Sequence, residues 1–268
     1  MSADSRSPLR FFAALYGVSV PFWVLGTVTP WQPVPGVPIS AAMFVCPCAV
    51  AILLVWREGR GAAVRALLLR SLDYRRMPKR WLGVGVALMP LVMLLSYWTL
   101  QTIGRPLPPV EIGVARAPAL FGAFLVTATL EQVGWSGYAL EPLQARLGAL
   151  RASVVLGLVW AAWHLIPLLQ AGRTPDWIAW WVLMTIALRV LQSWLYNGAG
   201  SSVAAAALLQ ASANTSWQLF PNRGSHYDPQ VTGLLLAAIA AGVVGFTGAT
   251  GLSSPMTGAT HSTSAPDE

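Results

Sequence analysis

Charged residues are scarce in this sequence. Only 10% of its 268 residues are Asp, Glu, Lys or Arg, whereas soluble domains carry about 25%. Hydrophobic residues make up 55% of the chain and 13 tryptophans are present, which excludes a disordered protein. Cysteine is rare too: Cys46 and Cys48 lie in an apolar run and are interpreted as packing residues, because a disulfide framework needs more of them. The composition therefore excludes a soluble domain and indicates an integral membrane protein.

Long apolar runs separate the few charges. A helix of about 20 residues crosses a hydrocarbon core about 30 Å thick, and eight such runs occur, at 11–28, 39–56, 81–103, 117–138, 152–169, 177–196, 202–220 and 231–250. The seventh is the least hydrophobic, because polar residues crowd its second half. We predict an all-α fold, a polytopic membrane bundle of about eight transmembrane helices. It forms one domain over residues 1–250, and the Ser-, Thr-, Gly- and Pro-rich tail 251–268 is expected to be disordered.

The distribution of Lys and Arg predicts the orientation. Twelve of these residues fall before the first span or between spans two and three or four and five, and four fall on the opposite side: Arg105, Arg116, Arg173 and Arg223. Since cytoplasmic loops retain positive charge, both termini are predicted to be cytoplasmic. The basic segment 60–72 is interpreted as a topology-setting loop rather than a surface helix. Topology accounts for the basic residues, so membrane lipid is an expected partner and nucleic acid is not.

Three ionisable residues lie inside the predicted spans. Glu131 is the only carboxylate well within one, His164 the only histidine and Arg189 the only arginine. Such residues are costly in hydrocarbon and face the bundle interior. Glu131 precedes Gly148 by 17 residues and His164 follows it by 16, so a turn at Gly148 places both at matching depth. For Arg189 two interpretations stay open: a counter-charge to Glu131, or a side chain that snorkels to the cytoplasmic face.

Further polar and aromatic residues share helix faces, because each pair is four residues apart: Gln132 with Ser136, Trp160 with His164, and Gln210 with Asn214. In one interpretation these side chains and Glu131 line a single water-accessible pocket. In the other, each polar group only bonds a neighbouring helix, as Asn and Gln often do in membranes.

Three segments carry a family resemblance: 131–140 (EQVGWSGYAL), 156–165 (LGLVWAAWHL) and 210–221 (QASANTSWQLFP). They resemble the CPBP family of intramembrane glutamic proteases, which includes the type II CAAX prenyl endopeptidases and bacterial relatives. The signature of that family is EExxxR on one helix, an aromatic residue four before a histidine on the next, and HxxxN or HxxxD further on. The resemblance covers residues 129–221, and we place the CPBP-like core at about 117–221.

The resemblance implies four catalytic positions. Glu131 matches the glutamate that acts as general base on a water molecule, and His164 matches the histidine that holds and polarises that water. Asn214 matches a donor that stabilises the oxyanion. Gln210 occupies the place of the third motif's histidine. Its amide can donate a hydrogen bond but cannot titrate, and the loss of a well-placed donor costs about a hundredfold in rate.

Three other motif positions are expected to support these residues. Trp160 is the motif aromatic, Gln132 replaces the second glutamate and Ser136 replaces the arginine. Removal of one member of a buried ion pair strands a charge, at a cost of about 3–5 kcal/mol, whereas replacement of both can be nearly neutral. Because Gln132 and Ser136 are both uncharged, the double replacement strands nothing.

These observations lead to a function hypothesis and two alternatives. The hypothesis is a metal-independent, glutamate-dependent endopeptidase of a bacterial plasma membrane that cleaves a membrane-associated peptide or protein. No metal or other cofactor is expected, because catalytic zinc takes three protein ligands and HExxH is absent from the sequence. One alternative is a catalytically impaired relative that acts as a binding, immunity or regulatory partner. The other is a transporter, suggested by the intramembrane acid, histidine and Arg189, although no inverted repeat is found.

Overall fold

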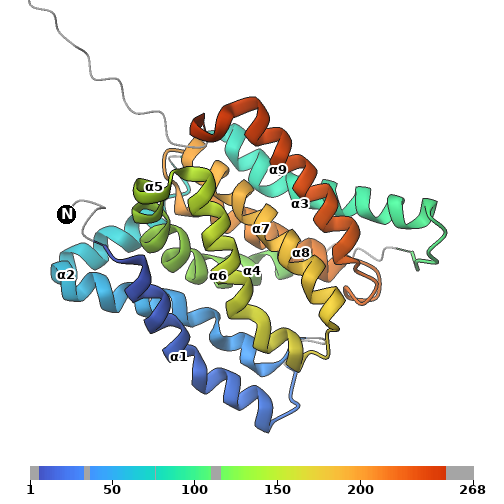
Figure 1. Ribbon diagram of the computed structural model, residues 1–268, viewed down its shortest axis with the longest axis horizontal. Coiled ribbons are helices and arrows are strands. Elements are labelled where there is room, and N and C mark those ends of the chain that lie inside the picture. Colours follow the sequence, from blue (N-terminus) through green and yellow to red (C-terminus); the bar gives the residue numbers. More distant parts are fainter. Residues whose placement is uncertain (1–5, 33–36, 76, 110–115, 252–268) are drawn as a thin grey trace, which may run out of the picture.

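The regular elements of the computed structural model are helices, which confirms the all-α prediction (Figure 1). The structure describes residues 6–32, 37–75, 77–109 and 116–251. In chain order the elements are α1 (Pro8–Val28), the 3₁₀ helix η2 (Ile39–Val45), α2 (Cys46–Ser71), α3 (Lys79–Thr102), α4 (Arg116–Gly134), the π-helix η3 (Trp135–Leu140), α5 (Glu141–Leu147), α6 (Ala149–Gln170), α7 (Pro175–Gly198), α8 (Val203–Leu219) and α9 (Pro229–Gly251).

Seven helical segments of the described chain are long and apolar enough to cross a membrane. They correspond to seven of the eight predicted spans. The remaining one, 202–220, forms α8, which has 17 residues and is shorter than the crossing length of about 20. Fourteen of its residues are buried, and it packs against α3, α4 and α7. The helix that the sequence predicted as a weak span is therefore largely an interior helix, packed against its neighbours.

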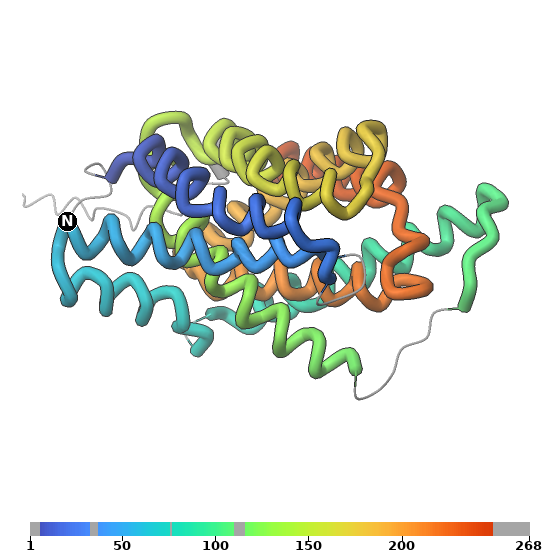
Figure 2. Tube along the Cα trace, turned by 90° about the horizontal axis from the view of Figure 1, so that it is seen from below, coloured from blue at the N-terminus to red at the C-terminus, as the bar shows by residue number. Residues whose placement is uncertain are grey.

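The helix α2 contains a sharp reversal that the sequence analysis did not predict. Gly59 and Arg60 have non-helical backbone angles, and Arg60 has a φ of 58°. Figure 2 shows the chain turning back on itself at this point. The residues that follow are helical as far as Ser71, so the expectation of a loop over 60–72 is wrong. Arg70 anchors this second half, because its Nη1 lies 2.7 Å from Oε1 of Glu141.

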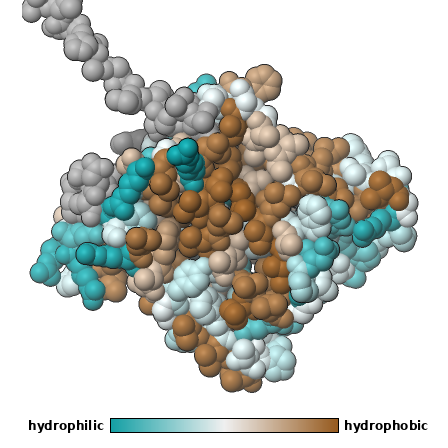
Figure 3. All heavy atoms as spheres, viewed as in Figure 1, coloured by the Kyte–Doolittle hydropathy of each residue, from teal (hydrophilic) through white to brown (hydrophobic). Residues whose placement is uncertain are grey.

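The outer surface of the bundle suits a lipid environment. Large apolar side chains such as Leu91, Trp98 and Phe246 are more than half exposed. Figure 3 shows apolar residues over the middle of one face, with hydrophilic residues toward its edges. The start of α1 and the end of α9 lie toward the same end of the bundle (Figure 1). The cytoplasmic location of that end, and the single-domain organisation, stay predictions. The predicted disordered tail, 251–268, lies outside the described residues except for Gly251.

Candidate active site

A hairpin brings the first two motif segments together. The helical path of α4 continues through η3 and α5 to Leu147, and Gly148 then turns the chain into α6 with a φ of 76°. That backbone angle is readily adopted by glycine, and the predicted turn at Gly148 is confirmed. The π-helix η3 follows Glu131 and Gln132 closely and is fully buried. Such wide turns occur often at functional sites, where they change the direction in which side chains point.

Glu131 lies in the bundle interior, with 6% of its surface exposed. Its Oε2 accepts a hydrogen bond of 3.1 Å from the indole N–H of Trp160 on α6. Trp160 also contacts His164: the two rings meet edge to face with centroids 5.2 Å apart, and His164 Nδ1 lies 3.0 Å from the Trp160 carbonyl oxygen. The glutamate and the histidine are therefore linked through a shared tryptophan.

Two glutamine amides form a hydrogen-bonded relay beside Glu131. The Oε1 of Gln132 accepts from Nη1 of Arg189 at 3.1 Å and from the hydroxyl of Ser136 at 2.5 Å. The Nε2 of Gln132 donates to Oε1 of Gln210 at 2.6 Å, and the Gln210 side chain lies close enough to the Glu131 carboxylate to interact with it. A guanidinium group can only donate, so Arg189 requires an oxygen from Gln132. This requirement turns the Gln132 amide nitrogen to Gln210, and it turns the Gln210 amide nitrogen to the carboxylate.

Arg189 is completely buried, so the snorkelling interpretation is wrong. Its guanidinium carbon lies 4.6 Å from the ring centroid of Trp160 and 6.0 Å from that of Trp135. It also interacts electrostatically with Glu131, which favours the counter-charge interpretation. Sequence identified Arg189 as the one arginine inside a span. Its partners follow from the packing of α7 against α6 and η3, which the sequence does not specify.

The face of α7 that carries Arg189 holds further buried polar groups. Thr185, Arg189 and Gln192 are four and three residues apart, which puts them on one side of the helix. Within the described part of the chain, no hydrogen-bond partner is found for the Thr185 hydroxyl, for Nε and Nη2 of Arg189, or for either amide atom of Gln192. Buried polar atoms are nearly always hydrogen-bonded, either to protein or to ordered water. This polar face of α7 is therefore a region where the protein itself leaves hydrogen-bonding capacity unused.

The structure brings five of the seven predicted site residues into one cluster. Glu131, Gln132, Ser136, Trp160 and Gln210 are joined by hydrogen bonds, and all are buried. They come from α4, η3, α6 and α8, as the three-motif pattern requires. Arg189 joins this cluster from α7, a helix outside the three motif segments.

His164 and Asn214 stand apart from the hydrogen-bonded cluster. Among the residues that the structure describes, His164 shares no hydrogen bond or ion pair with Glu131, and its ring also packs on Trp163 and Trp181. Asn214 is half-buried, one helical turn beyond Gln210. Over the same residues, no group of three His, Cys, Asp or Glu side chains is arranged to hold a metal ion.

The chain is similar in sequence to known proteins. The sequence model of the family described as "Type II CAAX prenyl endopeptidase Rce1-like" matches residues 113–216. The chain is also 24% identical to CAAX prenyl protease 2 of Methanococcus maripaludis over 173 residues, which are 61% of this chain and 64% of that relative. The chain thus spans a little under two thirds of the relative's length.

These two matches confirm the resemblance to the CPBP family that the three motifs indicate. The matched residues 113–216 include Glu131, His164, Gln210 and Asn214. They begin and end close to the predicted core of 117–221. Together with the seven apolar helices, the family match identifies an integral membrane protein.

Proposed function

We propose that this chain is a membrane-embedded endopeptidase that uses Glu131, without a metal ion, to hydrolyse a membrane-associated peptide or protein. The observation that carries the proposal is the hydrogen-bonded cluster around Glu131, in which residues of all three motif helices surround one buried carboxylate. The matched relative bears the name of a CAAX prenyl protease. For this chain we correspondingly propose a membrane-associated peptide or protein as the substrate.

The proposed reaction requires a base, a water molecule and donors for the developing oxyanion. Glu131 accepts a proton from water, and the water oxygen bonds to the carbonyl carbon of the scissile peptide. The carbonyl oxygen becomes an oxyanion, stabilised by the amide of Asn214. The C–N bond then breaks, and the proton held by Glu131 passes to the leaving amine. His164 holds the water, and the unused hydrogen-bonding groups on the Arg189 face of α7 provide further water sites.

Arg189 compensates for the altered first motif. The family arginine is replaced by Ser136, which removes one cation from the first motif segment. In the structure Ser136 and Arg189 donate to the same oxygen of Gln132. The small serine side chain leaves room for a guanidinium that arrives from α7. The site therefore retains one cation and one carboxylate, although the cation comes from another helix.

The test is a cleavage assay on purified protein in lipid nanodiscs with a peptide library. Glu131→Gln keeps the shape of the side chain and removes the base, so we expect cleavage to fall at least a hundredfold, the lower range for loss of a general base. Asp176→Asn is the matched control, because Asp176 is an exposed carboxylate in the first turn of α7. Activity that survives Glu131→Gln at the wild-type level eliminates the mechanism.

One observation favours a second function, the binding of a peptide without hydrolysis. Both ends of the Gln210 amide are engaged inside the cluster, by Gln132 and Glu131, and its side chain is 1% exposed. In this state Gln210 has no donor directed at a substrate oxyanion. Gln210→His restores the motif residue. An inert wild type that gains cleavage in this variant identifies the protein as a binding or regulatory relative.

A further inference from the structure

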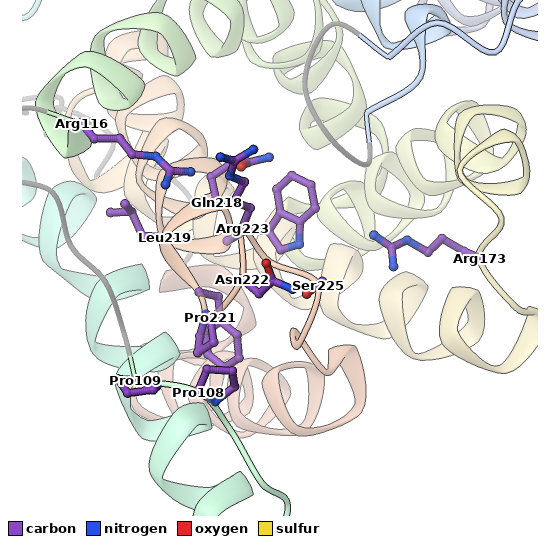
Figure 4. Close-up of a pocket in the computed structure, with 12 residues that line it drawn as sticks. Pro108, Pro109, Arg116, Arg173, Gln218, Leu219, Pro221, Asn222, Arg223 and Ser225 are labelled. Carbon is purple, nitrogen blue, oxygen red and sulfur yellow. The ribbon is translucent and has the colours of Figure 1, made fainter.

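A second polar region lies at the end of the bundle where α8 ends and α4 begins. A pocket of about 700 Å³ opens there, and its lining includes Arg116, Arg173, Gln218 and Arg223. We call it the basic pocket. In Figure 4 the side chains of Arg116, Gln218 and Arg223 group on one side, and Arg173 extends toward them from the other. These residues come from the start of α4, the α6–α7 turn, the last turn of α8 and the α8–α9 turn.

The described lining of the basic pocket is rich in hydrogen-bond donors. No carboxylate occurs among its described lining residues. The side chain of Gln218 is 2% exposed, and its Nε2 has no hydrogen-bond partner within the described chain. Arg105 provides the contrast, because this nearby arginine pairs with Asp228 at 3.2 Å. Three guanidinium groups and an unpaired buried amide are the donor set that binds a phosphate or carboxylate group.

An apolar groove continues from the basic pocket along the bundle. It has a volume of about 390 Å³ and is lined by residues of α3, α4 and α8, including Val86, Leu94 and Phe121. Leu219 and Phe220 line both the groove and the basic pocket. Tyr97 of the groove also donates a hydrogen bond to the carbonyl of Pro108, which lines the pocket. The two spaces are therefore neighbours that share part of their lining, one with cationic side chains and the other largely apolar.

We propose that this surface binds one anionic phospholipid, with its phosphate in the basic pocket and an acyl chain in the apolar groove. Two of the three helices that line the groove, α3 and α4, are long and apolar enough to cross a membrane. Val86 and Leu94 are exposed on the outside of the bundle, where acyl chains are the surrounding medium. A free phosphate matches only the pocket. An anionic peptide terminus also matches the charge of the pocket, but an anionic lipid matches both spaces, with its phosphate in the pocket and its hydrocarbon chain in the groove.

The experiment is native mass spectrometry of the purified full chain with phosphatidylglycerol, phosphatidylcholine or inorganic phosphate. We expect one phosphatidylglycerol to bind in preference to phosphatidylcholine, and phosphate alone to bind far more weakly. An arginine near an anionic membrane surface contributes about 1 kcal/mol, which corresponds to about fivefold in affinity. Arg116→Gln and Arg223→Gln should each weaken phosphatidylglycerol binding by about fivefold. Gln218→Leu, which removes the unpaired amide, should weaken it as well.

Arg151→Gln is the matched control, because Arg151 is an exposed arginine at the start of α6 and does not line the pocket. Its phosphatidylglycerol affinity should equal that of the wild type. Equal binding of the two lipids overturns the proposal, and so does an unchanged affinity in the Arg116→Gln, Arg223→Gln double variant. If phosphate binds as tightly as lipid, the site is a free-anion site. If a peptide with a free carboxylate displaces the lipid and its amidated form does not, the pocket is a peptide site instead.

Discussion

Arginine occurs in two contrasting settings in this protein. In the core cluster around Glu131, Arg189 is completely buried, donates to Gln132 and lies over two tryptophan rings. In the basic pocket, Arg116 and Arg223 are exposed, and the described lining holds no carboxylate to pair with them. The side chains of the core cluster bond mainly to one another, although Nε and Nη2 of Arg189 have no partner in the described chain. The arginines of the pocket have no carboxylate among the described lining residues. The first arrangement is suited to holding a reactive group in place, and the second to receiving an anion from outside.

The largest expected effect is the loss of the buried arginine. Arg189→Met leaves the carboxylate of Glu131 without its counter-charge, and breaking a buried charge pair costs about 3–5 kcal/mol. The free energy of unfolding, measured by denaturant titration in mixed micelles, should fall by this amount. The double variant Glu131→Gln, Arg189→Met should recover part of the loss, because the two residues interact. A double variant that loses the sum of both single effects contradicts the pairing.

The second effect concerns the amide relay. Gln132→Leu removes the acceptor of Arg189 and the donor to Gln210, and each stranded buried group costs about 1–3 kcal/mol. Ser136→Ala is the milder companion, since it removes one donor and leaves the Gln132 oxygen bonded to Arg189. Unfolding titrations should rank Gln132→Leu well below Ser136→Ala in stability. The reverse order would mean that the relay does not hold the cluster together.

A third, smaller effect concerns the loop that carries Arg223. Gly224 has a φ of 79°, and an added Cβ would lie 2.8 Å from the Trp217 carbonyl oxygen. Gly200 has a similar φ of 74°, but a Cβ added there would have no neighbouring heavy atom within 4 Å. Gly200→Ala is therefore the control for backbone strain alone. Overpacking costs about 1–3 kcal/mol, and Gly224→Ala should be less stable than Gly200→Ala by that difference. Equal thermal denaturation of the two variants would show that the loop relaxes freely.

The smallest expected effect sharpens the contrast between the two arginine settings. Arg116→Gln removes an exposed charge at the start of α4, and such surface changes usually stay within about 0.5 kcal/mol. The unfolding titration should therefore match that of the wild type, while anionic lipid affinity falls. A stability loss comparable to that of Arg189→Met would place Arg116 in the structural core and remove the distinction.

Much of the site was predictable from residue spacing. A turn at Gly148 was predicted and is present, and the three motif segments lie on α4 with η3, on α6 and on α8. The role of Arg189 was not predictable, because it lies on a helix outside the motifs and its neighbours are set by helix packing. The depth argument also could not foresee that Trp160 would connect Glu131 with His164.

The predicted spans, like the site, were correct in part. Hydropathy identified seven segments that are long and apolar enough to cross a membrane. It also included α8 among the spans, because hydropathy depends on local composition and does not distinguish burial by other helices from burial by lipid. In the structure α8 is buried by protein rather than lipid. The reversal at Gly59 and Arg60 was missed because the basic segment after it was interpreted as a loop, whereas it forms a second helical stretch as far as Ser71.

The sequence alone determined that the protein is helical and membrane-embedded, where its main turn lies, and which polar residues face the interior. These properties depend on local composition and on distances along one or two helices. Only the tertiary structure decided that Arg189 accompanies Glu131, how the Gln132 and Gln210 amides are oriented, and that three distant arginines meet in one pocket. Those features depend on contacts between helices far apart in the chain, and no spacing within a single segment specifies which helices become neighbours.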